Sequence, residues 1–166
     1  MSFFEIKEIN GGWIDGHIKD DKNSVDFSYS YITDFLGDLL EEILFVLDNK
    51  KKCGIVDTEI EPGSDFWKIV LDNKIIIISL FLDEKHDYII NTEEDFFKIK
   101  ERLVNENSDY DFKFTIDEFV NNFINEIENN LDKYNENYLK DCLDNRRTID
   151  NLKKYIMEIK KKLIKD

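Results

Sequence analysis

Residues 24–48, SVDFSYSYITDFLGDLLEEILFVLD, contain the change of period that decides the fold. Over residues 24–31 apolar and polar side chains alternate, which is typical of a strand with one buried face. Beyond Thr33 apolar residues recur every three or four positions, which predicts an amphipathic helix over residues 34–48. Thr33 is the expected N-cap of this helix. The sequence therefore predicts a strand followed directly by a helix.

The rest of the first half reads as further strands. Short stretches with the apolar residues of strands, separated by turn residues, cover residues 3–9, 13–19, 54–60, 65–71 and 75–82. The last of these, IIIISLFL, is apolar on both faces, so we expect it at the centre of a sheet and covered on both sides. Short links between the strands favour an antiparallel arrangement.

The last third of the chain has helical spacing. Thr115 and Glu118 form a capping-box pattern, and Thr148 is placed to cap a final helix. Residues 83–109 are the least readable part: a short helix after Thr92 and an irregular insertion are both compatible with them, and residues 110–115 would add an edge strand.

Together these patterns predict one α+β domain, residues 1–166. Its expected parts are a strand-rich region, 1–82, a variable region, 83–114, and a helical region, 115–166. We expect an antiparallel sheet of six or seven strands, one helix after the third strand and a helical C-terminal third.

The chain is strongly acidic, with 37 Asp and Glu against 23 Lys and Arg and a net charge of −14. The electric field of such a chain repels nucleic acid and anionic membranes and speeds encounter with a basic protein. Solubility alone also explains the charge. Residues 146–166 differ, with 8 basic and 3 acidic residues. This basic end either docks on its own acidic neighbours or forms a homo-oligomer through the C-terminal helix.

Several features predict a cytoplasmic protein. The first residues, MSFFEIKEIN, have no apolar run typical of a signal peptide, and no run approaches the roughly 20 residues of a membrane-spanning helix. Cys53 and Cys142 are far apart in sequence and form no CxxC motif. No glycine-rich phosphate loop is present either, so the sequence predicts no cofactor.

Two groups of residues are candidates for a metal site. Asp15 and His17 lie two apart on a predicted strand and share one face, where they could hold a divalent ion. An exposed polar strand face explains the same pattern.

The second candidate group, Asp57, Glu59 and Glu61, also shares a strand face, with Asp65 and Lys68 beyond the next turn. Acids near a lysine can bind Mg²⁺ and polarise a phosphate. A solvated sheet edge explains these acids equally, and the chain lacks the basic surface of a nucleic-acid enzyme.

Three segments occur in a patterned order: GGWIDGHI at 11–18, SYSYITDFLGDLLEEIL at 28–44 and EPGSDFWKI at 61–69. Together they resemble an uncharacterised family of small bacterial α+β proteins, which have a Trp strand, an S-Y-x-T-D helix entry, an E-P-G turn and a second Trp strand. The resemblance covers residues 11–82. It implies a shape and assigns no residue a role.

Three functions follow as hypotheses. The first is a non-catalytic acidic protein-binding module, immunity-like or antitoxin-like, that offers an acidic face to a basic partner. The second is a metal-assisted hydrolase with a site near Asp15 and His17. The third is a structural module that self-associates through its C-terminal helix.

Overall fold

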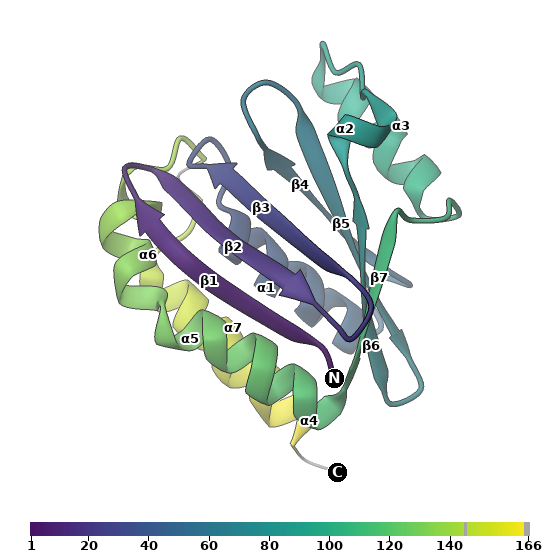
Figure 1. The fold of residues 1–166 in the computed structure, drawn as a ribbon. Helices are drawn as coiled ribbons and strands as arrows, with labels where there is room; N and C mark the ends of the chain where they lie inside the picture. The colour runs from purple at the N-terminus through teal and green to yellow at the C-terminus, as the bar shows by residue number, and fades with distance from the viewer. Residues whose placement is uncertain (145, 165–166) are drawn as a thin grey trace.

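The computed structural model describes residues 1–144 and 146–164. Within these residues seven antiparallel strands form two sheets, which confirms the α+β class and divides the strands three and four (Figure 1). The first sheet has the order β1 (Phe3–Asn10), β2 (Trp13–Lys19) and β3 (Ser24–Ser30). The second has the order β4 (Gly54–Glu59), β5 (Ser64–Asp72), β6 (Ile75–Phe81) and β7 (Tyr110–Thr115).

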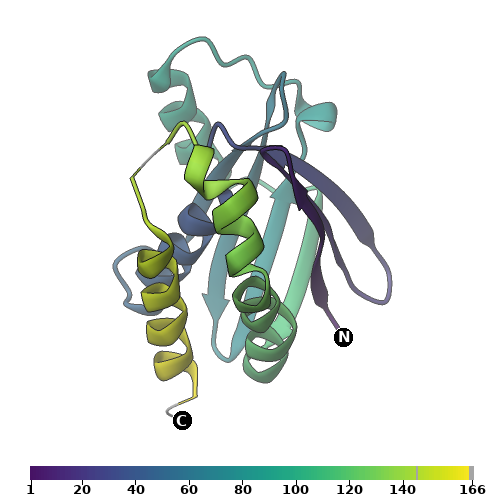
Figure 2. The same ribbon diagram turned by 90° about the vertical axis from the view of Figure 1, so that its left-hand side faces the viewer.

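The helices of the described chain are α1 (Phe35–Leu47), α2 (Asp83–His86), α3 (Glu93–Leu103), α4 (Ile116–Phe119), α5 (Asn125–Asn129), α6 (Leu131–Asn137) and α7 (Ile149–Leu163). A π-helical turn, Val120–Ile124, joins α4 to α5. The helical C-terminal third is therefore confirmed, and its last helix, α7, packs against α1 and α6 (Figure 2). None of the described helices combines the length and the apolar character that crossing a bilayer requires.

The alternation in β3 produces the buried face that the sequence predicts. Val25, Phe27 and Tyr29 are buried and pair with buried residues of β2. Phe27 lies opposite Gly16, where a Cβ atom would come within 2.5 Å of the Phe27 ring. The glycine thus leaves room for the aromatic ring to cross the strand.

The first helix is capped by Asp34, so the prediction of Thr33 as its N-cap is wrong. Asp34 Oδ1 accepts a hydrogen bond of 3.0 Å from the backbone N–H of Gly37. Thr and Asp are both favourable N-cap residues, and their adjacent positions could not be separated by spacing alone. In the C-terminal third, the predicted caps Thr115 and Thr148 are confirmed.

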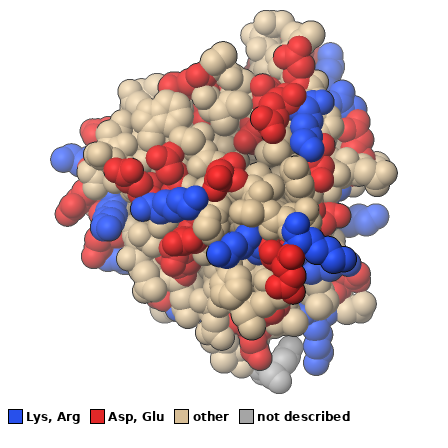
Figure 3. Space-filling model, viewed as in Figure 1, with Lys and Arg blue, Asp and Glu red and all other residues tan. Residues whose placement is uncertain are grey.

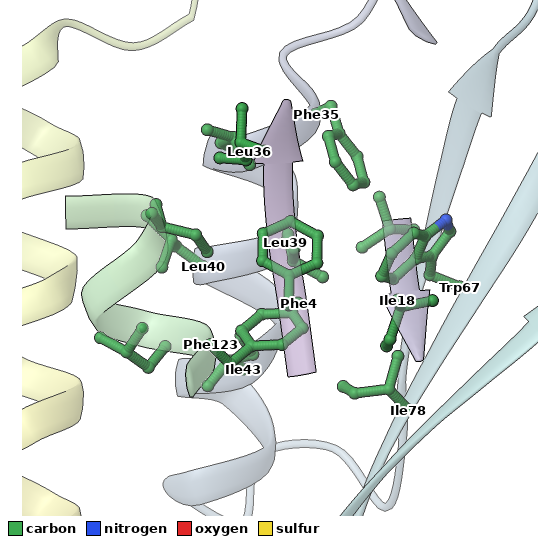
Figure 4. Close-up of a cluster of buried hydrophobic side chains, with 14 of the residues drawn as sticks. Phe4, Ile18, Phe35, Leu36, Leu39, Leu40, Ile43, Trp67, Ile78 and Phe123 are labelled. Carbon is green, nitrogen blue, oxygen red and sulfur yellow. The ribbon is translucent and has the colours of Figure 1, made fainter. Parts of the chain in front are cut away.

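One large hydrophobic core joins both sheets, α1 and the C-terminal helices (Figure 4). Trp67 of β5 is fully buried within it. Its ring meets those of Phe4, Phe27, Tyr29 and Phe35 at steep angles, with centroids 5.3 to 6.3 Å apart. Such edge-on packing stabilises aromatic pairs beyond the area they bury.

β6 is an inner strand between β5 and β7, as its apolar sequence predicts. Ile78 and Leu80 belong to the large core, whereas Phe81 belongs to a smaller second cluster. That cluster consists of Phe66, Phe81, Ile99 and Leu103. Ile75 and Ile77 remain partly exposed. The strand is therefore covered on both faces only at the end where α3 lies.

Candidate binding site

Asp15 and His17 lie on the outer face of β2, as predicted, but they have different partners. Asp15 accepts a hydrogen bond from Ser28. His17 Nε2 lies 2.9 Å from Glu5 Oε2, and its Nδ1 lies 3.8 Å from Asp26 Oδ1. Among the residues that the structure describes, no group of three or more His, Cys, Asp and Glu side chains is arranged to hold a metal ion.

The second candidate group is divided as well. Lys100 of α3 pairs with Asp57 at 2.5 Å, and Glu61 is exposed in the turn after β4. Lys68 donates to two backbone carbonyls at and just beyond the end of α3, so it fixes that helix. Glu59 lines a pocket. Burial raises the pKa of Glu59, and the neighbouring Asp57 and Glu61 carboxylates raise it further.

This pocket has a volume of about 630 Å³ and lies between the β4–β5 turn and residues 83–96. Its size is within the usual range of small-ligand sites. The lining residues are Glu59, Pro62, Gly63, Ser64, Asp83, Asp87, Tyr88, Ile90, Asn91, Thr92, Glu93 and Phe96. We call it the acidic pocket, because four of these residues are Asp or Glu and none of them is Lys, Arg or His.

The basic side chains of the segment that forms one wall have partners elsewhere. Lys98 pairs with Glu94, Lys100 with Asp57 and Arg102 with Glu106. The ammonium of Lys85 lies over the Tyr110 ring, and His86 contacts Asp109. These contacts leave the carboxylates of the acidic pocket without a basic neighbour in its lining.

The E-P-G turn gives the pocket its floor. Gly63 has a φ of +106°, a backbone region that favours glycine. A Cβ atom there would lie 2.6 Å from Asp83 Oδ2. The Asp83 carboxylate can therefore lie against the turn, where its Oδ1 accepts a 3.5 Å hydrogen bond from the Ser64 backbone N–H.

Behind this floor lies a second carboxylate, Asp65, which is 8% exposed. Its Oδ1 accepts a hydrogen bond of 2.9 Å from the Asp83 backbone N–H, and its Oδ2 accepts one of 3.2 Å from the Tyr29 hydroxyl. That hydroxyl in turn accepts a 2.7 Å hydrogen bond from Trp67 Nε1. Burial raises the pKa of Asp65, and the nearby Asp83 and Glu84 carboxylates act in the same direction. This chain of contacts connects the pocket wall to the core between the two sheets.

Sequence reasoning identified Glu59 but missed the other carboxylates of the pocket. Asp83, Asp87 and Glu93 all lie in the region that had no readable period. One signal pointed to this region indirectly. A strand that is apolar on both faces needs a cover, and the residues after Leu82 supply it.

A separate polar cluster holds the C-terminal segment in place. Arg147 is buried and contacts Asp34 at 3.2 Å, Asp38 at 2.7 Å and Glu41 at 2.5 Å. The hydroxyl of Tyr134 donates to Asp34 at 2.7 Å. The Asp of the S-Y-x-T-D segment is thus a cap and a buried ion partner, which is a structural role.

Comparisons with known proteins returned no family model, no curated protein and no solved structure that matches this chain. The resemblance of residues 11–82 to a family of small bacterial proteins stays a prediction.

Proposed function

We propose that this chain is a non-catalytic module that binds a basic protein, in the manner of an immunity protein or an antitoxin. The observation that carries this proposal is the acidic pocket, whose lining contains four Asp or Glu residues and no basic residue. Such a module would act in the cytoplasm, the location that the sequence predicts.

Net charge supports a basic partner but does not locate its site. On the face shown in Figure 3, acidic side chains are interspersed with Lys and Arg, so no single-sign patch dominates it. The acidic pocket differs, because its carboxylates have no such interspersed cations. A net charge of −14 would steer a basic protein toward the chain, and the pocket would supply local complementarity.

Exposed apolar side chains next to the pocket support a protein partner. Ile89 is 78% exposed and Phe97 is 59% exposed, and each is adjacent in sequence to residues of the pocket lining. Protein interfaces combine apolar side chains that become buried on binding with a polar surround. The two residues would belong to the part of such an interface that becomes buried on binding.

Capture of a partner from the native host tests this function. We expect the immobilised full chain to retain a basic protein at low salt and to release it as salt screens the charges. The pocket variant Glu59→Gln/Asp87→Asn should retain at least about tenfold less.

The matched control is Asp132→Asn/Glu136→Gln, which removes the same charge from exposed positions of α6. It should retain the partner as the unaltered chain does. If the unaltered chain retains no protein at low salt, or both variants lose it equally, the proposed function is wrong.

The other two hypotheses rest on weaker grounds. A hydrolase near Asp15 and His17 would need ligands beyond two residues whose partners lie in different directions. For self-association, the apolar stripe of α7 is already covered: Leu152, Ile156 and Ile159 are buried within the chain. Both stay predictions.

A further inference from the structure

We propose that a second pocket of this chain binds a small amphipathic carboxylate, a molecule with an unbranched alkyl chain and one carboxylate group. The pocket lies at the Ile75 end of β6, whereas α3 covers the Phe81 end. Its volume is about 540 Å³, within the usual range of small-ligand sites. Its lining shares no residue with the acidic pocket, so the inference is independent of the proposed protein-binding function.

The lining of this second pocket, which we call the apolar pocket, combines aliphatic side chains with a few polar ones. The aliphatic residues are Leu47, Leu71, Ile75, Ile116 and Leu163, and the others are Asn73, Lys74, Thr115, Asp117 and Lys162. All five aliphatic residues are half-buried. They therefore retain apolar area that a bound alkyl chain would remove from water.

The position of Ile75 in β6 explains why this area stays open. The strand is apolar on both faces and needs a cover on each of them. The cross-strand neighbours of Ile75 are Asp72 of β5 and Thr115 of β7, which are both polar and exposed. The described residues thus cover Ile75 only in part, and an apolar ligand would complete the cover.

Behind the pocket, a narrow apolar gap separates α1 from β5 and β6. The gap is lined only by Ile43, Val46, Leu47, Ile69, Leu71 and Ile76, and it has no room for a water molecule. Leu47 and Leu71 line both the gap and the pocket. These two side chains have incomplete packing behind them, so they can shift inward to admit the end of an alkyl chain.

Lys74 indicates the charge of the ligand. It is exposed in the two-residue turn between β5 and β6, and it forms an ion pair with none of the described acids. The other lysine of the lining, Lys162, already pairs with Asp48. Asp117 lies in the first turn of α4, where the helix N-terminus favours a carboxylate. A ligand carboxylate would therefore find its cation in Lys74.

Titration of the full chain with decanoate, followed by amide NMR shifts, tests the site. We expect saturable shifts at the amides of Ile75, Ile116 and Leu163, with a dissociation constant on the order of 0.1 mM. Octanoate should bind about tenfold more weakly, because each buried methylene strengthens binding about three- to fourfold.

Decylammonium has the same chain length and the opposite charge, so it tests the role of the carboxylate. In about 0.15 M salt, which screens the charge of the rest of the chain, it should bind at least about threefold more weakly than decanoate.

Two pairs of variants locate the contacts. Lys74→Gln should weaken decanoate binding about threefold, whereas Lys22→Gln, at an exposed lysine of the β2–β3 turn, should leave it unchanged. Ile75→Thr keeps the branched Cβ atom but removes apolar area, and it should weaken binding about fivefold. Its control is Ile77→Thr, on the same face of β6 and also half-buried but outside the lining, which should have no effect.

Several results would overturn the inference. They are the absence of saturable shifts at the pocket, binding of decylammonium as tight as that of decanoate, and equal effects within either pair of variants. Light scattering excludes another occupant: a dimer that Ile75→Thr dissociates would mean that a second copy of the chain covers the pocket, and the inference would be wrong.

The acidic-pocket variant Glu59→Gln/Asp87→Asn separates this inference from the proposed function. It should bind decanoate as the unaltered chain does, because the two linings share no residue. A loss of decanoate binding in this variant would contradict the assignment of the ligand to the apolar pocket.

Discussion

Asp34 and Asp65 are both buried carboxylates, but the charged groups nearest to them differ. Asp34 lies beside a cation, whereas the charged neighbours of Asp65 are further carboxylates. Asp34 lies 3.2 Å from the guanidinium of Arg147, which also holds Asp38 and Glu41. Asp65 accepts hydrogen bonds from a hydroxyl and a backbone N–H, and none of the described basic side chains forms an ion pair with it.

The pKa values reflect this difference. Burial alone would lower the pKa of Arg147, but the carboxylates of Asp38, Asp34 and Glu41 raise it above its usual value. The pKa of Asp65 is raised by its burial and by further acids. The first cluster therefore contains a cation that offsets part of its negative charge, whereas the second has no such cation and borders a pocket lined by acids.

The largest effect should come from removing the cation that Asp34, Asp38 and Glu41 share. Arg147→Met leaves three carboxylates without their shared cation, one of them fully buried. Removing one partner of a buried ion pair costs about 3 to 5 kcal/mol of unfolding free energy. Urea denaturation followed by circular dichroism measures it.

Arg146 provides a control from the adjacent position. Its side chain is 60% exposed and also pairs with Asp38, so Arg146→Met should cost less than about 1 kcal/mol. Equal losses for the two variants would show that the buried pairing of Arg147 has no special weight.

A smaller effect is expected at the hydrogen-bonded carboxylate. Tyr29→Phe removes the acceptor of the buried Trp67 N–H and one donor to Asp65. A buried polar group left unsatisfied costs about 1 to 3 kcal/mol. The loss should appear in the same urea denaturation. Tyr31→Phe, at a partly buried tyrosine, should change stability less, and the reverse order would contradict the role given to Tyr29.

The two clusters also show how far the sequence predicts the structure. β3 and α1 each bury one face, so their periods are visible in the residues themselves, and the sequence locates their junction to within one residue, at Thr33 instead of Asp34. Residues 83–109 bury few side chains, so they show little periodicity. Their position depends on β6, one end of which they cover. Glu59 and Asp83 therefore line the same pocket through tertiary packing that no spacing in the sequence expresses.

The smallest expected effect is on the pH dependence of the unfolding free energy. It tests whether the negative charge of Asp65 lacks a compensating positive charge in the folded chain. Since its pKa in the folded chain is raised above the ordinary 3.8, the folded state holds this proton more tightly than the unfolded state does. Its contribution to the unfolding free energy is therefore greatest below pH 3.8 and declines as pH rises through the folded pKa.

Asp65→Asn should remove that decline, whatever constant offset the substitution adds, so the curves of unfolding free energy against pH should diverge above pH 3.8. Urea denaturation at a series of pH values measures both curves. Parallel curves would mean that Asp65 titrates alike in both states. The acidic character of the pocket wall would then not extend to the carboxylate behind it.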